Sequence, residues 1–219
     1  MIFNFEKFSL TADLERGEIT SLAINGKERV ASPSELFRIR LRDREGKELL
    51  LSSREAKNCQ VTDDGAIYSG FCADVSVKVS IKNENGEAAS RISVIHNGED
   101  FFTEWVDFPN ITLPMLEKNN RDGNGGRILF PYNEGALVSD IDEREESPLS
   151  YTEPEYPSHG SYAMFPNMVC SQMLAYLWED VGLYIGAHDE KRGVKDINFY
   201  KSENGVTLRF RILCGKHFG

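Results

Sequence analysis

The chain has 219 residues, of which 40% are hydrophobic and 27% charged, and this composition is that of an ordinary globular protein. The formal net charge of −10 argues against nucleic acid as a partner, because a surface that follows phosphates needs clustered Lys and Arg. No apolar run approaches the roughly 18 residues of a membrane helix, so no membrane partner is expected.

Turn signals recur through the first hundred residues and again near the end of the chain. Asn-Gly and Asp-Gly pairs supply the positive φ angles that tight hairpin turns need. They stand at Asn25-Gly26, Asp64-Gly65, Asn85-Gly86, Asn97-Gly98 and Asn204-Gly205. Between two of these pairs, residues 75–82 alternate apolar and polar side chains. Such alternation is typical of an antiparallel strand with one buried and one solvated face.

The same alternation appears in residues 37–44 and 206–212. Arg38, Arg40, Arg42 and Arg44 form a basic row that alternates with apolar residues, and we interpret them as the solvated face of a strand. Residues 173–178 fit a short helix or a buried strand equally well, because so short an apolar run has no decisive period. Many short strands joined by regular turns predict an all-β, mostly antiparallel two-sheet β-sandwich.

The middle of the chain breaks this rhythm. Most of the prolines fall between Pro109 and Pro166, in a stretch that also holds many aromatic side chains. A disordered linker would have few aromatics, so we predict long, irregular but ordered central loops packed on the sandwich. Long ordered loops in compact domains usually carry function, and we expect any ligand site there.

Motifs for metals, cofactors and catalysis are weak. The four cysteines lie far apart without zinc spacing, and we interpret them as free thiols. An EF-hand loop starting at Asp122 would need glutamate at its twelfth position, where the chain has Asn133. Carboxylate pairs such as Glu104 with Asp107 are interpreted as solvated loop charges, although glycosidases use such pairs. We therefore predict no catalytic residue, no metal and no cofactor.

Aromatic and polar residues of the central loops suit a sugar surface. Aromatic rings stack on the apolar faces of sugars while polar tips bind hydroxyls, although a packed loop cluster would have the same composition. Polar groups further along could point at the same ligand or satisfy loop backbone groups. The predicted carbohydrate-binding residues are Tyr151, Tyr156, His159, Tyr162, Gln172, Asp189 and Lys195.

Short motifs in the second half of the chain resemble a known family. They are Phe165-Pro166, Ser171-Gln172-Met173, Gly182-Leu183-Tyr184-Ile185, Asp189 and Lys195. The segment from Leu10 to Asn25-Gly26 is also similar to a first hairpin of that family. The family is the galactose-mutarotase-like β-supersandwich that precedes a (β/α)8 catalytic barrel in some bacterial glycoside hydrolases.

The resemblance implies a non-catalytic domain that packs on a C-terminal catalytic domain absent from this chain and lends loops to its glycan site. Residues 1–219 would then form a single domain, the N-terminal part of a longer protein. Two alternatives stay open: a free-standing carbohydrate-binding or assembly module, and an aldose-epimerase-like enzyme. The paired histidines and late glutamate of an epimerase are not found in the sequence. We expect a cytoplasmic location, or secretion if a leader preceded Met1.

Overall fold

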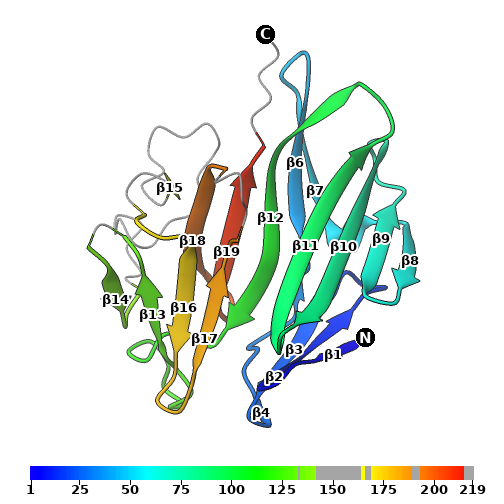
Figure 1. Ribbon diagram of the computed structural model, residues 1–219. Coiled ribbons are helices and arrows are strands. Elements are labelled where there is room, and N and C mark those ends of the chain that lie inside the picture. Colours follow the sequence, from blue (N-terminus) through cyan, green and yellow to red (C-terminus); the bar gives the residue numbers. More distant parts are fainter. Residues whose placement is uncertain (133, 142–163, 166–168, 189–192, 215–219) are drawn as a thin grey trace. The chain divides into compact units, whose positions relative to one another are not determined.

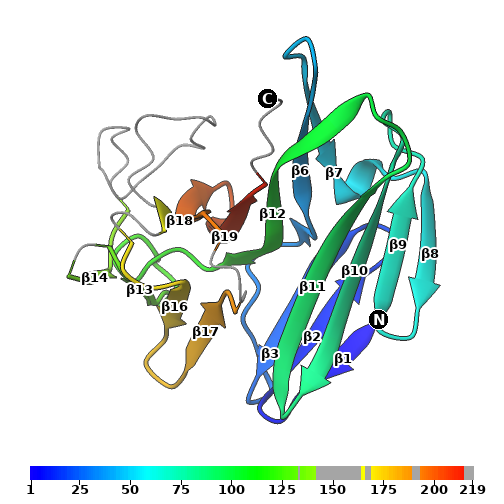
Figure 2. The same ribbon diagram turned by 45° about the horizontal axis from the view of Figure 1, so that its top comes forward.

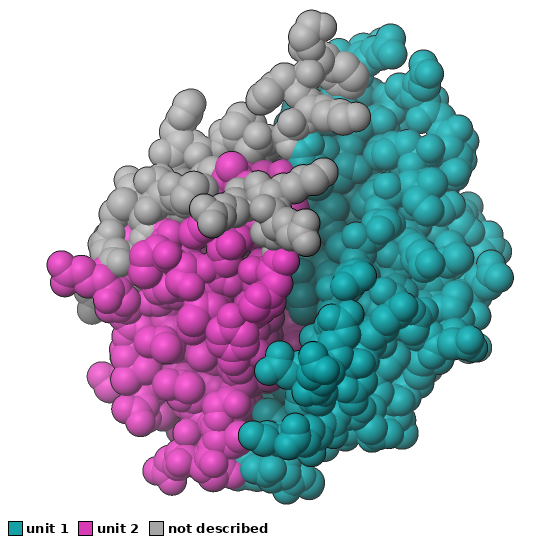
Figure 3. Space-filling view, viewed as in Figure 1, with its two compact units in different colours: residues 1–110, 214–219 teal, residues 111–213 magenta. Residues whose placement is uncertain are grey.

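The computed structural model describes residues 1–132, 134–141, 164–165, 169–188 and 193–214. The chain divides into two compact units, which Figure 3 shows in different colours. Unit 1 consists of Met1–Asn110 with Cys214–Gly219, and unit 2 consists of Ile111–Leu213.

The first sheet of unit 1 is built from the N-terminal hairpins (Figure 1). Its strands are β1 (Ile2–Asn4), β2 (Phe8–Asp13), β3 (Glu18–Ile24), β4 (Lys27–Glu28) and β5 (Ser34–Glu35). They run in the order β1-β2-β3-β4, and β5 also pairs with β3. Leu10, Leu22 and Ile24 alternate with less buried residues, so one face of this sheet faces the core.

The second sheet of unit 1 has the order β11-β10-β9-β8 (Figure 2). Its strands are β8 (Asn58–Thr62), β9 (Gly65–Ser69), β10 (Val75–Glu84) and β11 (Glu87–His96). Asn85 and Gly86 have φ angles of 57° and 89°, so the predicted tight turn joins β10 to β11. Val75, Val77 and Val79 are buried, as their alternation predicted.

A third group of strands in unit 1 consists of β6 (Arg38–Asp43), β7 (Glu48–Ser52) and most of β12 (Phe101–Leu113). β6 pairs with both β7 and β12 in antiparallel register. A short 3₁₀ helix, η1 (Ser53–Glu55), follows β7 and begins with a capping box from Ser52 to Glu55. Ile39 and Leu41 are buried on one face of β6, and the arginines occupy the other.

Unit 2 begins within β12, and its strands come from the second half of the chain. One sheet has the order β14-β13-β16-β17, and β15, β18 and β19 pair in that order beside the end of β12. The bounds are β13 (Arg127–Phe130), β14 (Ala136–Val138), β15 (Met164–Phe165), β16 (Met173–Leu177), β17 (Gly182–Gly186), β18 (Lys195–Ser202) and β19 (Gly205–Leu213). The segment that could have been helix or strand is therefore strand β16.

The prediction of an all-β, antiparallel chain is confirmed, and no α-helix occurs in the residues that the structure describes. The prediction of two sheets is wrong, because the strands group into four sheets. Arg127–Phe130 and Ala136–Val138, expected in irregular loops, form β13 and β14 instead and build a separate sheet with β16. Turn signals identify neighbouring strands, but the grouping of hairpins into sheets depends on long-range contacts.

No helix among the described residues is long and apolar enough to span a membrane. Trp105 and Trp178 are both buried.

Candidate functional site

Most of the predicted carbohydrate-binding residues lie outside the described part of the chain. These are Tyr151, Tyr156, His159, Tyr162 and Asp189. The structure describes Gln172 and Lys195. The grouping of the whole set around one ligand therefore stays a prediction.

Lys195 begins β18 and is buried, so its side chain does not extend into solvent. Its Nζ donates a hydrogen bond to the backbone oxygen of Gly193 at 2.6 Å and lies 6.0 Å from the ring centroid of Phe165. Gln172 precedes β16 and is half-buried, and its Oε1 is buried without a hydrogen-bond partner. Gln172 thus has an open acceptor, whereas the ammonium of Lys195 is held by its own loop.

A buried polar surface lies in unit 2 on β18, β19 and the end of β12. We call it the unit 2 polar face, and it consists of Thr112, Asp196, Asn198, Thr207, Arg209 and Arg211. On β18 and β19 the alternate positions, such as Ile197, Phe199 and Phe210, are apolar and also buried. These strands therefore bury both faces, one apolar and one polar.

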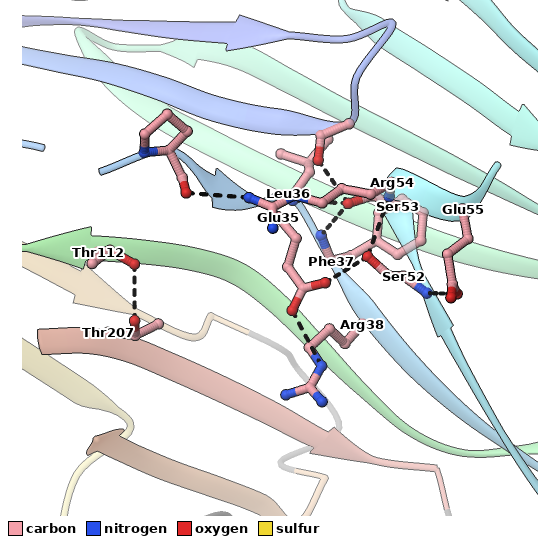
Figure 4. Close-up of polar contacts among 12 residues, drawn as sticks. Glu35, Leu36, Phe37, Arg38, Ser52, Ser53, Arg54, Glu55, Thr112 and Thr207 are labelled. Carbon is pink, nitrogen blue, oxygen red and sulfur yellow. Dashed lines mark hydrogen bonds and ion pairs between the residues drawn. The ribbon is translucent and has the colours of Figure 1, made fainter. Parts of the chain in front are cut away.

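Arg209 is the central cation of the unit 2 polar face. Its Nη2 donates to Asp196 Oδ2 at 2.8 Å, and its guanidinium carbon lies 5.7 Å from the ring centroid of Tyr200. Its Nε and Nη1 are buried and have no hydrogen-bond partner. The hydroxyls of Thr112 and Thr207 are 2.8 Å apart and bond to each other (Figure 4).

The energetics of this arrangement are unusual for a purely structural face. A buried ion pair is weak evidence for stability, because the loss of solvation of two charges offsets their attraction. Buried donors without partners cost further free energy, and native proteins contain few of them. The two unpaired donors of Arg209 are therefore the groups of this face whose burial the described residues do not compensate.

A second charged surface lies in unit 1, on the arginine side of β6. We call it the unit 1 polar face, and it consists of Glu35, Arg38, Arg40, Arg42, Glu48, Glu104, Trp105 and Asp107. Arg42 Nε donates to Glu104 at 3.0 Å, and Arg42 also pairs with Glu48. The guanidinium carbon of Arg40 lies 5.5 Å from the ring centroid of Trp105.

These contacts correct two interpretations of the sequence. The arginine row of β6 is not a freely solvated face, because its side chains are mostly buried and paired with carboxylates. Glu104 and Asp107 are not solvated loop charges, because both are buried in strand β12. Sequence alternation identifies the two faces of a strand but does not say what covers the polar one.

Glu35 is a carboxylate of the unit 1 polar face that lies between Ser52 and Arg38 (Figure 4). Burial raises the pKa of its carboxyl, and the nearby charge of Asp107 acts in the same direction. The Ser52 hydroxyl, which donates to Glu35 at 2.5 Å, and Arg38, at 3.2 Å, partly oppose this rise in pKa. Glu35 therefore keeps its proton to a higher pH than an exposed glutamate does.

Neither polar face has the ligands of a metal site. In the described ranges, no group of three or more His, Cys, Asp or Glu side chains is close enough to hold an ion.

Comparison with protein-family models and with curated proteins found no match to this chain.

Sequence reasoning missed the unit 2 polar face as a candidate site. Thr207, Arg209 and Arg211 appear in the sequence as the polar side of an alternating strand. The sign that this polar side is buried is the matching of polar partners across β18 and β19, where Asp196 lies opposite Arg211 and Asn198 lies opposite Arg209. That signal can be used only once the register of β18 and β19 is known.

Proposed function

We propose that this chain is a non-catalytic, carbohydrate-associated domain of a glycoside hydrolase. In this role it packs on a catalytic barrel carried by another part of the protein and lends loops to a glycan site. The hydrolase context rests on the motif resemblance around Gln172 and Gly182-Leu183-Tyr184-Ile185. The carbohydrate association is supported by the residues of the unit 2 polar face.

The observation that carries the proposal is the unpaired guanidinium edge of Arg209. Sugars are rich in hydroxyl oxygens that accept hydrogen bonds, and the free N–H groups of Arg209 are donors only. The threonine hydroxyls and the amide of Asn198 add groups that both donate and accept. Asp196 is already bonded to Arg209, so it is an orienting group rather than a proton donor.

Calorimetric titration of the whole chain with neutral mono- and oligosaccharides tests the association. We expect binding that weakens about tenfold or more in Arg209→Lys, because lysine keeps the charge but lacks the planar set of donors. Arg91→Lys is the matched control, since Arg91 is exposed on β11 and pairs with Glu84 at 3.3 Å. Thermal unfolding of each variant establishes that it is folded at the titration temperature.

Two results would overturn this association. One is the absence of heat with every sugar for the unmodified chain, and the other is equal affinity of the unmodified chain and Arg209→Lys. The hydrolase context has its own test in the reading frame after the codon for Gly219. We expect that frame to continue into alternating strands and helices, and a stop codon would favour the free-standing module.

A further inference from the structure

A row of side chains crosses the outer face of the four-stranded sheet of unit 2, exposed on β13, β14 and β17 and buried at Ala175 on β16. The row follows from the register, in which Leu137 lies opposite Leu129, Leu129 opposite Ala175, and Ala175 opposite Tyr184. Directly opposed residues point to the same face of a sheet, so these four side chains form a strip on one face, in which the small side chain of Ala175 lies buried between Leu129 and Tyr184. The other face, with Ile128, Phe130, Leu174 and Tyr176, is buried.

The strip is open to solvent at both ends. Tyr184 is 56% exposed, Leu137 is 51% exposed and Leu129 is 37% exposed. Exposed apolar groups that line up across a sheet are more informative than single exposed ones, because they offer a continuous apolar contact surface.

The ring of Tyr184 lies along its own strand instead of standing away from it. A Cβ built on Gly186 would be 2.3 Å from the Tyr184 hydroxyl oxygen and 2.7 Å from its Cζ. The ring thus occupies the space that any larger side chain at position 186 would need. The glycine at position 186 of β17 (Gly182–Gly186) therefore leaves room for the Tyr184 ring along its own strand.

Among the described residues, a histidine lies beside this ring and a compensated ion pair lies farther along the same face. The His188 ring lies 6.4 Å from the Tyr184 ring, centroid to centroid, and is exposed. At the far side of the same face, Arg127 Nε lies 3.5 Å from Glu117 Oε2, so these two charges compensate each other. A neutral strip on a chain of net charge −10 suits an uncharged ligand and disfavours an acidic polymer.

We propose that this strip, which we call the Tyr184 platform, binds a neutral polysaccharide chain by stacking a pyranose ring on Tyr184. The C–H face of the sugar lies on the ring and on Leu129, and the hydroxyls at its edge reach His188 and the Arg127–Glu117 pair. The inference rests on the proposed carbohydrate association, but it uses residues other than those of the unit 2 polar face. In these two proposals, the unit 2 polar face binds a short sugar, and the Tyr184 platform is a second site, on the surface, that binds a polymer.

Affinity electrophoresis of the whole chain tests the platform. The gels contain soluble starch, β-glucan, hydroxyethyl cellulose or arabinoxylan, and polygalacturonate is the acidic comparison. We expect retardation by at least one of the neutral polymers and none by polygalacturonate. Tyr184→Ala is expected to raise the dissociation constant about tenfold, whereas Tyr184→Phe keeps the stacking surface and most of the affinity.

The flanking glycines give a matched pair of variants that leave the tyrosine itself intact. Gly186→Ala places a methyl group where the Tyr184 hydroxyl lies, so the ring must move and the affinity is expected to fall. Gly182→Ala is the control, because its Cβ would meet only the flexible end of Leu177, at 3.0 Å. Circular dichroism and thermal unfolding verify that each variant is folded, which is expected since these positions are on the surface.

Several outcomes would overturn the platform. They are no retardation of the unmodified chain by any neutral polymer, unchanged retardation of Tyr184→Ala, and preferential binding of polygalacturonate. A sedimentation measurement that shows self-association lost in Tyr184→Ala would assign the strip to a second copy of the chain instead. Arg209→Lys separates the two proposals: if the platform is right, this variant keeps its polymer retardation even where short-sugar binding is lost.

Discussion

At the scale of single residues, burial decides what a charged group can do, and Glu35 is the clearest case. Its carboxyl is largely buried on β5, between the Ser52 hydroxyl and Arg38. Burial raises the pKa of this carboxyl above the ordinary value of 4.5. A raised folded-state pKa means that the folded chain holds the proton more tightly than the unfolded chain does.

The first prediction follows from the sign of this linkage. Between pH 4.5 and the raised pKa of Glu35, the folded state binds more protons, so its stability relative to the unfolded state falls as pH rises. Glu35→Gln removes this contribution. We expect the free energy of unfolding of the variant, relative to the unmodified chain, to increase as pH rises from about 4 to 7. Urea unfolding at several pH values measures the difference.

Glu28→Gln provides a control of opposite sign in the same unit. Burial opposes ionisation of Glu28, but hydrogen bonds from the Ser21 hydroxyl and from the backbone N–H groups of Val30, Leu22 and Arg29 lower its pKa overall. Its stabilising contribution is present above its unfolded pKa and is lost as pH falls through the folded one. Parallel pH trends in the two variants would contradict the assignment for Glu35.

At the scale of elements, the hairpins show what the sequence can specify. Asn25-Gly26, Asp64-Gly65, Asn85-Gly86 and Asn204-Gly205 all join antiparallel strand pairs, as their turn chemistry predicted. The same prediction is wrong for Asn97-Gly98, because β11 and β12 on either side of it belong to different sheets. Burial of the apolar side of β10 was predictable for the same reason, since one register places all its valines on one face.

Other features of the fold depend on contacts that no local pattern contains. Nothing near Arg127 or Leu137 in the sequence indicates that β13 pairs with β16 across some fifty residues, so the separate sheet of unit 2 was missed. The alternation of β19 separated Arg209 from its apolar neighbours correctly, but its burial depends on packing. Tyr184 lies in a motif that the sequence did single out, yet the exposure of the Tyr184 platform required the register of four strands.

The second prediction concerns the turn between β10 and β11. Gly86 has a φ angle of 89°, which side chains rarely adopt, and a Cβ there would lie 2.8 Å from Glu6 Oε2. Gly86→Ala is expected to lower the free energy of unfolding by about 1–2 kcal/mol. Gly98→Ala, at the opposite end of the same hairpin, has no neighbour closer than 3.7 Å and should change it by less than about 0.5 kcal/mol. Similar losses in both variants would contradict strain at Gly86.

At the scale of the whole molecule, both units place arginines next to carboxylates on their polar faces, so that these charges largely compensate each other. The acidic surplus of the chain lies outside the two polar faces, where arginines are paired with or placed beside carboxylates. An acidic exterior repels acidic polymers and favours neutral partners. This distribution supports a carbohydrate ligand over a nucleic acid for both proposed sites.

The cysteines provide a prediction that involves the whole chain. None of the four forms a disulfide; Cys72 and Cys170 are exposed, and Cys59 and Cys214 are partly buried. Burial raises the pKa of the Cys59 and Cys214 thiols, which lowers the fraction of reactive thiolate. Titration of the folded chain with an aromatic disulfide reagent near pH 8 should therefore show a fast phase from Cys72 and Cys170 and a slow phase from the other two.

Cys72→Ser tests this assignment, since it should remove half of the fast phase and leave the slow phase unchanged. In denaturant, all four thiols should react at one rate, because the environments that distinguish them are lost. The thermal midpoint should also be the same with and without a reducing agent, as no disulfide constrains the chain. Fewer than four thiols in unreduced denaturant would contradict free cysteines, and a single rate in the folded chain would contradict the burial of Cys59 and Cys214.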